Sequence, residues 1–109
     1  MSKKMNLEYE GSKFTLEMNR DSVRNLEANG FRLSMIEEQP MTMIPMLVYG
    51  AFSMHHPRVK KSLVDEIYHS ITDKGDFVAA LMDMYGDTLE TLTAAPEEGT
   101  AKNVSWKMS

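Results

Sequence analysis

The first part of the chain shows strict alternation of apolar and polar residues on both sides of a short turn. Two-residue periodicity around a glycine-containing turn predicts a β-hairpin over residues 5–18. An isolated hairpin is only marginally stable in water, so its apolar face is expected to pack against helices. The apolar positions of this pattern are Leu7, Tyr9, Phe14, Leu16 and Met18, with Gly11 at the turn.

Three later segments have the three- and four-residue spacing of apolar positions that is typical of amphipathic helices. These helices are predicted at about residues 20–29, 60–72 and 76–94. Asn19 is expected to cap the first of them and Asp76 the last, because short polar side chains satisfy free N–H groups there. Their inward-facing residues are expected to be Val23 and Leu26; Val64, Ile67, Tyr68 and Ile71; and Phe77, Leu81, Met84, Tyr85, Leu89 and Leu92.

A further segment, residues 42–56, is apolar on every side instead of along one stripe. A helix of this kind is buried at the centre of a domain or against another protein. Thr42 is expected to cap it, which would place Pro45 in its first turn, where the missing N–H costs little. Gly50 is interpreted as a point of close packing against another helix. The segment is therefore predicted to be the central helix.

Together these patterns predict an α+β fold in which an N-terminal β-hairpin packs on a bundle of about four α-helices. A single compact domain is expected over residues 1–95, followed by a flexible tail at residues 96–109. The chain has 109 residues, which is long enough to bury a core without disulfides or metal. It contains no cysteine, so disulfides and thiolate metal sites are excluded.

Charge and hydropathy narrow the classes of partner. The formal net charge of −4 argues against non-specific nucleic-acid binding, which requires lysine and arginine to neutralise phosphates. The apolar stretch at residues 41–54 is shorter than the roughly 20 residues that span a bilayer. No apolar run follows the basic start, so no targeting segment is expected. We expect a cytoplasmic protein that binds neither nucleic acid nor membrane.

Motifs for catalysis or metal binding are missing from the sequence. It has no Gly-x-Ser-x-Gly turn, no glycine-rich phosphate loop and no His-Glu-x-x-His. His55 and His56 are adjacent, and neighbouring helical side chains diverge by about 100°, so one ion is not expected to bind both. Glu66 and His69 match Glu-x-x-His, but di-iron bundles need two copies of that motif. We therefore expect no catalytic residue, no cofactor and no metal, and a binding protein instead of an enzyme.

The central segment supplies the first candidate partner-binding residues. Methionine is flexible and is over-used on surfaces that fit several partners. Met41, Met43 and Met46 lie near the start of this segment, where some methionines are expected to stay exposed. They are candidate partner-binding residues, although a methionine-rich stripe is more often part of a core.

Arg58, Lys60 and Lys61 form the second candidate, a positive cluster in an acidic chain. The cluster is interpreted either as a solvated turn that complements the C-terminus of the central helix or as a docking patch for an acidic partner.

Val104 and Trp106 alternate with a polar residue, as in an extended segment. They either fold back on the hairpin of the same chain or bind a partner.

These motifs resemble a known family. The sequence reads Leu-Glu-Tyr-Glu-Gly-x-x-Phe-Thr-Leu-Glu from Leu7, Val-Arg-Asn-Leu-Glu-x-Asn-Gly-Phe from Val23, and Met-Ile-Pro-Met-Leu from Met43. It continues with Gly-Ala-Phe-x-x-His-His, Val-Asp-Glu-Ile-Tyr and a closing Lys-Asn-Val-Ser-Trp. This order is similar to that of small proteins encoded by phages and prophages of Gram-positive bacteria, and it resembles the tail assembly chaperones of long-tailed phages.

The resemblance implies a function as well as a fold. Such chaperones hold the tape measure protein, the tail tube protein or both in the host cytoplasm until the tail polymerises, and they are absent from the mature virion. The family offers no catalytic residue to carry over. The alternative is a structural tail or connector subunit of the virion, which would self-assemble through a symmetric interface. Formation of a homo-oligomer is left open.

Overall fold

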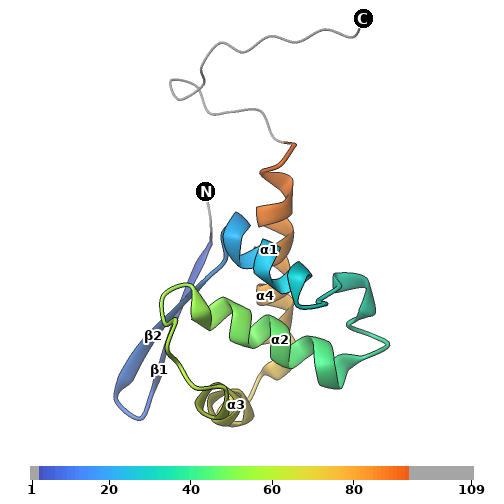
Figure 1. Ribbon diagram of the computed structural model, residues 1–109. Coiled ribbons are helices and arrows are strands. Elements are labelled where there is room, and N and C mark those ends of the chain that lie inside the picture. Colours follow the sequence, from blue (N-terminus) through green and yellow to red (C-terminus); the bar gives the residue numbers. More distant parts are fainter. Residues whose placement is uncertain (1–2, 94–109) are drawn as a thin grey trace, which may run out of the picture.

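The computed structural model describes residues 3–93 and shows a β-hairpin followed by helices that pack against it (Figure 1). The predicted α+β fold class is confirmed. The predicted tail at residues 96–109 lies outside the described residues. The elements are β1 (Lys4–Tyr9), β2 (Ser12–Glu17), α1 (Arg20–Ala28), the short 3-10 helix η1 (Leu33–Met35), α2 (Pro40–Ser53), α3 (Lys61–Ser70) and α4 (Lys74–Glu90).

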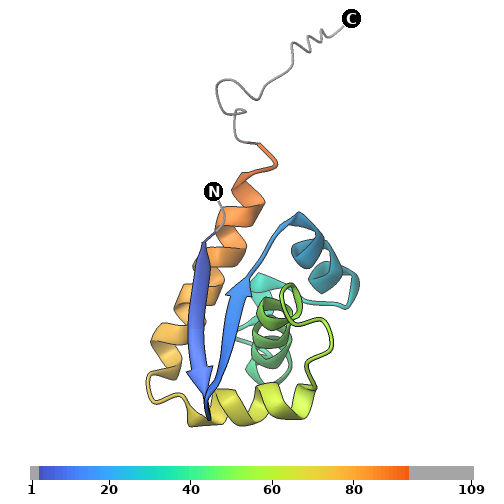
Figure 2. The same ribbon diagram turned by 90° about the vertical axis from the view of Figure 1, so that its left-hand side faces the viewer.

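The hairpin is antiparallel and closes through a two-residue turn. Glu10 and Gly11 both have positive φ, at 49° and 82°, which is the geometry that matches the right-handed twist of the strands. The register then places the apolar residues of both strands on one face, with Leu16 fully buried. Figure 2 shows α3 crossing below the hairpin turn, where the Tyr9 hydroxyl donates to the Glu66 carboxylate over 3.1 Å.

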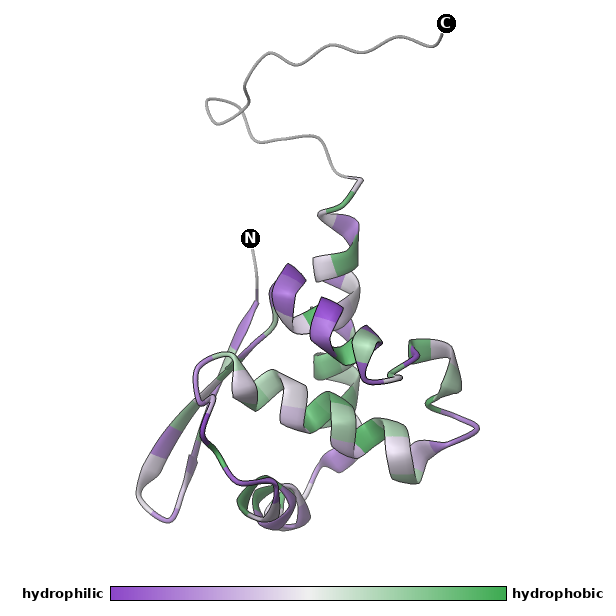
Figure 3. Ribbon diagram, in the orientation of Figure 1, coloured by the Kyte–Doolittle hydropathy of each residue, from purple (hydrophilic) through white to green (hydrophobic). Residues whose placement is uncertain are grey.

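Helix α2 is the centre of the domain. It contacts α1, α3, α4, η1 and β2, and in Figure 3 it is green or pale along its length. Because α2 is apolar on most of its circumference, elements must cover it from several directions to remove that surface from water. The prediction of a central buried helix is confirmed. Its buried residues are Met43, Leu47, Val48, Gly50, Ala51 and Phe52.

The ends of α2 differ from those predicted. The helix begins at Pro40, which occupies its first position, so Thr42 is not its cap. Pro45 consequently lies inside the helix, where it has no N–H to donate to the carbonyl of Met41. Met41 itself is an exposed residue. The regular helix ends at Ser53, earlier than predicted, and the chain then turns ahead of Pro57.

Helix α4 also differs at both ends. It begins at Lys74, so Asp76 is inside its first turn and is not the cap. At the other end the helix stops at Glu90, and Leu92 is 68% exposed. The prediction that Leu92 faces inward is therefore wrong, because the apolar spacing continues beyond the last residue that another element covers.

Gly50 is a point of close contact between α2 and α1. A Cβ atom built on Gly50 would lie 2.9 Å from the Leu26 Cδ2 atom, which is closer than van der Waals contact allows. Leu26 is itself buried. The interpretation of Gly50 as a helix-packing position is confirmed, and it explains how α1 approaches the central helix.

Two histidines hold the hairpin on the end of α2. The backbone N–H of Thr15 donates to Nε2 of His56 over 3.0 Å. Nε2 of His55 lies 2.7 Å from an oxygen of the buried Glu17 carboxylate. Phe14 makes an edge contact with His56, at 5.1 Å between ring centroids. Since Thr15 N–H faces away from β1, His56 also covers part of the free edge of the sheet.

We predict that Gly50→Ala destabilises the protein by about 1 kcal/mol or more. Overpacking against Leu26 outweighs the gain in helix propensity. Gly86→Ala is the matched control, because Gly86 lies inside α4 with no atom within 4 Å of its built Cβ. This control should stabilise by about 0.5–1 kcal/mol. Urea unfolding of both variants measures the difference; equal effects of the same sign would contradict close packing at Gly50.

We predict that His56→Ala destabilises the protein by about 1–2 kcal/mol, because the amide of Thr15 loses its acceptor. His69→Ala is the control, since the His69 side chain is exposed at the end of α3. That substitution should change the free energy of unfolding by less than about 0.5 kcal/mol. Thermal unfolding at neutral pH compares the two variants, and an unchanged midpoint for His56→Ala would show that the hairpin does not depend on this bond.

Candidate functional site

One face of α2 remains open to solvent. Met41 is 90% exposed, Pro45 is exposed, and Met46 and Tyr49 are half-buried. Residues 41, 45 and 49 are spaced four apart, so they follow one side of the helix. We call Met41, Pro45, Met46 and Tyr49 the α2 strip. It is an apolar surface on a helix whose other sides are in the core.

The structure brings the α2 strip together with part of the basic cluster. A shallow hollow of about 140 Å³ is lined by three residues of the strip, Pro45, Met46 and Tyr49, and by Lys61 and Asp65 of α3. The Lys61 ammonium lies 5.3 Å from the centre of the Tyr49 ring, a cation–π arrangement. One charge of each sign thus borders the apolar surface.

Other predicted partner-binding residues are not part of this surface. Met43 is buried, and its sulfur accepts from the backbone N–H of Arg32 over 3.4 Å, so Met43 belongs to the core. Met43 lies on the side of α2 that faces the loop before η1, not on the side that faces solvent. Arg58 and Lys60 are exposed in the α2–α3 connection, and no ion pair within residues 3–93 involves them. Val104 and Trp106 lie outside the described residues.

The histidines that suggested a metal have other contacts. His55 and His56 both bind β2, and the Glu66 carboxylate accepts from Tyr9. Within residues 3–93, no three or more histidine, aspartate or glutamate side chains are grouped closely enough to hold a metal ion. Over the same residues, none of the helices has the length and hydropathy needed to cross a membrane.

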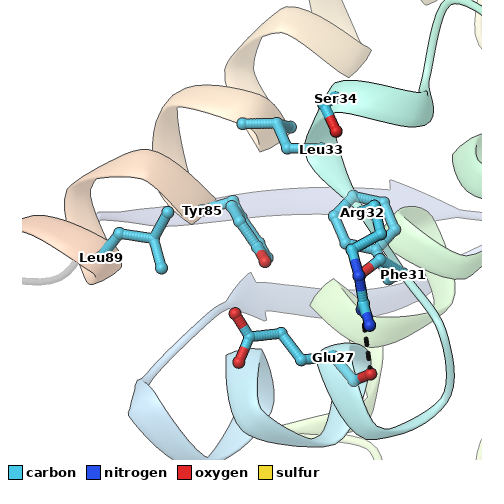
Figure 4. A pocket seen from close by; sticks show the side chains of 7 residues that line it. All are labelled: Glu27, Phe31, Arg32, Leu33, Ser34, Tyr85 and Leu89. Atoms are coloured by element: carbon cyan, nitrogen blue, oxygen red, sulfur yellow. Dashed lines mark hydrogen bonds between the residues drawn. The ribbon is translucent and has the colours of Figure 1, made fainter.

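A larger hollow of about 450 Å³ lies between α1, α4 and η1 (Figure 4). We call it the α1–α4 hollow. Its lining residues come from residues 27–34 and 85–89, which only the packing of α1 on α4 brings together. The sequence offered no signal for it, because Tyr85 and Leu89 fit a buried helical stripe. The lining residues are Glu27, Phe31, Arg32, Leu33, Ser34, Tyr85 and Leu89.

The two charged side chains that line this hollow, Glu27 and Arg32, differ in their contacts. Arg32 donates to the backbone carbonyls of Glu27 and Phe31, at 3.2 and 2.8 Å, and so binds the end of α1. The Tyr85 ring is buried edge-on against Phe31, with 5.2 Å between centroids. Burial, and then the negative charge of Glu27, raise the pKa of the Tyr85 hydroxyl. The hydroxyl therefore keeps its proton at neutral pH.

We predict that ionisation of Tyr85 destabilises the fold in alkali. Its pKa is raised above the ordinary value of 10.0, so above that pH the unfolded chain has lost a proton that the folded chain keeps. Stability must then fall as pH rises beyond about 10. Ultraviolet titration of the wild type minus Tyr85→Phe should show a phenol with a midpoint above 10. A difference curve centred at or below 10 would contradict this.

Comparison with known proteins identifies a family. A family model described as a domain of unknown function, DUF5055, matches residues 1–109. No curated protein and no solved structure matches the chain. The match spans both surfaces described above, and its description names no activity, ligand or partner. Because the model covers the whole sequence, the chain belongs to the DUF5055 family.

Proposed function

We propose that this protein is a non-catalytic binding protein that acts as a phage tail assembly chaperone. It holds the tape measure protein, the tail tube protein or both in the host cytoplasm before the tail polymerises, and it is absent from the mature virion. The observation that supports binding is the α2 strip, where Met41 is 90% exposed on the central helix of the domain.

The chemistry of the α2 strip suits an apolar helical partner. A helix that lays its apolar face on such a surface removes both partners' side chains from water. Met41 and Met46 are unbranched and polarizable, so they can adjust to more than one partner sequence. Lys61 and Asp65 border the strip and would orient a partner through charges at the rim.

The assignment to phage tails has a separate support. It comes from the motifs between Leu7 and Trp106 that resemble tail assembly chaperones. A tape measure protein of that system is long, helical and apolar, and it must be kept from aggregating before assembly. An exposed, adaptable apolar strip is the kind of surface that this task requires.

We predict that the double variant Met41→Gln, Met46→Gln binds the cognate tape measure or tail tube protein more weakly, by about tenfold or more. Burying one methionine side chain contributes about 1.5–3 kcal/mol, and 1.4 kcal/mol corresponds to a factor of ten. Co-expression with each partner and recovery on a tagged copy of this chain would measure soluble complex. Titration of the purified proteins would then give the dissociation constants.

Met54→Gln is the matched control, because Met54 is also a partly exposed methionine but lies outside the α2 strip. It should leave binding unchanged. Thermal unfolding of each variant separates lost binding from lost folding. Equal weakening of binding by both variants would show that the α2 strip is not part of the interface. Recovery of this chain in purified virions would contradict a chaperone and indicate a structural subunit.

A further inference from the structure

The edge of β1 that faces away from β2 has no neighbouring strand among residues 3–93. Because the Thr15 N–H donates to His56 and not to β1, Asn6 and Thr15 form a non-hydrogen-bonded pair. Every second residue of β1, namely Lys4, Asn6 and Glu8, therefore turns its backbone N–H and C=O away from β2. Among residues 3–93, no backbone hydrogen bond outside the regular elements reaches these groups. This edge is thus a template for one further strand.

The apolar side of β1 lies over an open groove. Met5 and Leu7 are only half-buried, whereas Leu16, which is opposite Met5 in β2, is fully buried. Met5 and Leu7 line a hollow of about 230 Å³ together with Ile71, at the end of α3, and Phe77 of α4. We call Met5, Leu7, Ile71 and Phe77 the β1 groove. In Figure 2 the first turns of α4 emerge from behind β1 on the side away from β2, so a strand added there would lie over α4.

The chain leaves the described region at the end of the sheet where this free edge begins. Helix α4 runs back along the hairpin toward the start of β1, and the Asp87 carboxylate lies 3.0 Å from the Lys3 ammonium (Figure 2). The described residues end at Thr93. Residues 94–102 can span about 30 Å when extended, and the six residues of β1 span about 20 Å. The residues that follow, 103–106, can therefore reach the whole free edge.

The sequence of residues 103–106 fits this edge. Val104 and Trp106 are apolar and are separated by the polar Ser105, so in a strand both apolar side chains would face the same side. Met5 and Leu7 have the same two-residue spacing in β1. A short tether also gives the segment an effective concentration of about millimolar, which favours it over a strand from another molecule.

We propose that residues 103–106 form a third strand on the free edge of β1, with the side chains of Val104 and Trp106 in the β1 groove. The direct path from the end of α4 makes this strand parallel to β1. Main-chain hydrogen bonds to the outward groups of β1 would hold the strand, and burial of two apolar side chains would add to its stability. The segment would also keep the sheet edge from pairing with other chains. The proposal does not depend on which partner binds the α2 strip.

The absence of cysteine from the chain allows a disulfide test in the full-length protein. Ser105 would face the same side of the sheet as Asn6, so Ser105→Cys with Asn6→Cys should form a disulfide within one chain on mild oxidation. Lys4→Cys and Glu8→Cys cover the neighbouring registers. Ser105→Cys with Lys13→Cys is the matched control, because Lys13 is exposed on the same face but in β2. Mass spectrometry of the monomer should show a higher yield for a β1 position than for Lys13. Equal yields, or disulfides only between chains, would overturn the proposal.

Trp106 is the only tryptophan of the chain, so its fluorescence reports directly on the segment. We expect emission at shorter wavelength, and weaker quenching by acrylamide, than in the urea-unfolded chain. Asn6→Pro removes the N–H at the centre of the free edge, where proline is tolerated in an edge strand, and should shift the emission to that of the unfolded chain. Asn6→Ala keeps this N–H and is the control.

Thermal unfolding checks that both Asn6 variants fold, and if Asn6→Pro does not fold, the disulfide yields decide. Emission of the wild type at the wavelength of the unfolded chain would contradict the proposal. Emission that stays at short wavelength in a folded Asn6→Pro variant would also contradict it, because Trp106 would then be buried elsewhere.

Discussion

The fold depends on removing the apolar surface of α2 from water. A helix with a conventional stripe needs one neighbour, but α2 is apolar on most of its circumference, so α1, α3, α4, η1 and β2 all pack on it. Gly50 permits the closest of these approaches, at Leu26. The other elements are therefore arranged so that a single small domain encloses one central helix.

The same constraint explains where polar side chains are used. The chain leaves α2 beside the hairpin, and His55 and His56 bond to Glu17 and Thr15 there. These groups would otherwise be poorly hydrated between two apolar surfaces, and unpaired buried polar groups are costly. Adjacent histidines that suggested metal chemistry are thus part of the packing of β2 on the central helix.

Two surfaces remain after the core is closed, and they differ in chemistry. The α2 strip is apolar and rich in methionine, with one charge of each sign at its border. The α1–α4 hollow is aromatic and contains a carboxylate that faces it. The hollow also contains Arg32, so each surface is bordered by one charge of each sign.

Local patterns in the sequence determined the hairpin, the helices and most of the core, because alternation and helical spacing report which side of an element is buried. They did not decide the helix ends, because α2 begins at Pro40, before the predicted cap, and α4 stops at Glu90, before Leu92. Nor could they separate Met41, which is exposed, from Met43, which is buried. That difference, and the hollow formed by Glu27 and Tyr85, arise only when helices distant in sequence pack together, since exposure is a property of the neighbours and not of the residue.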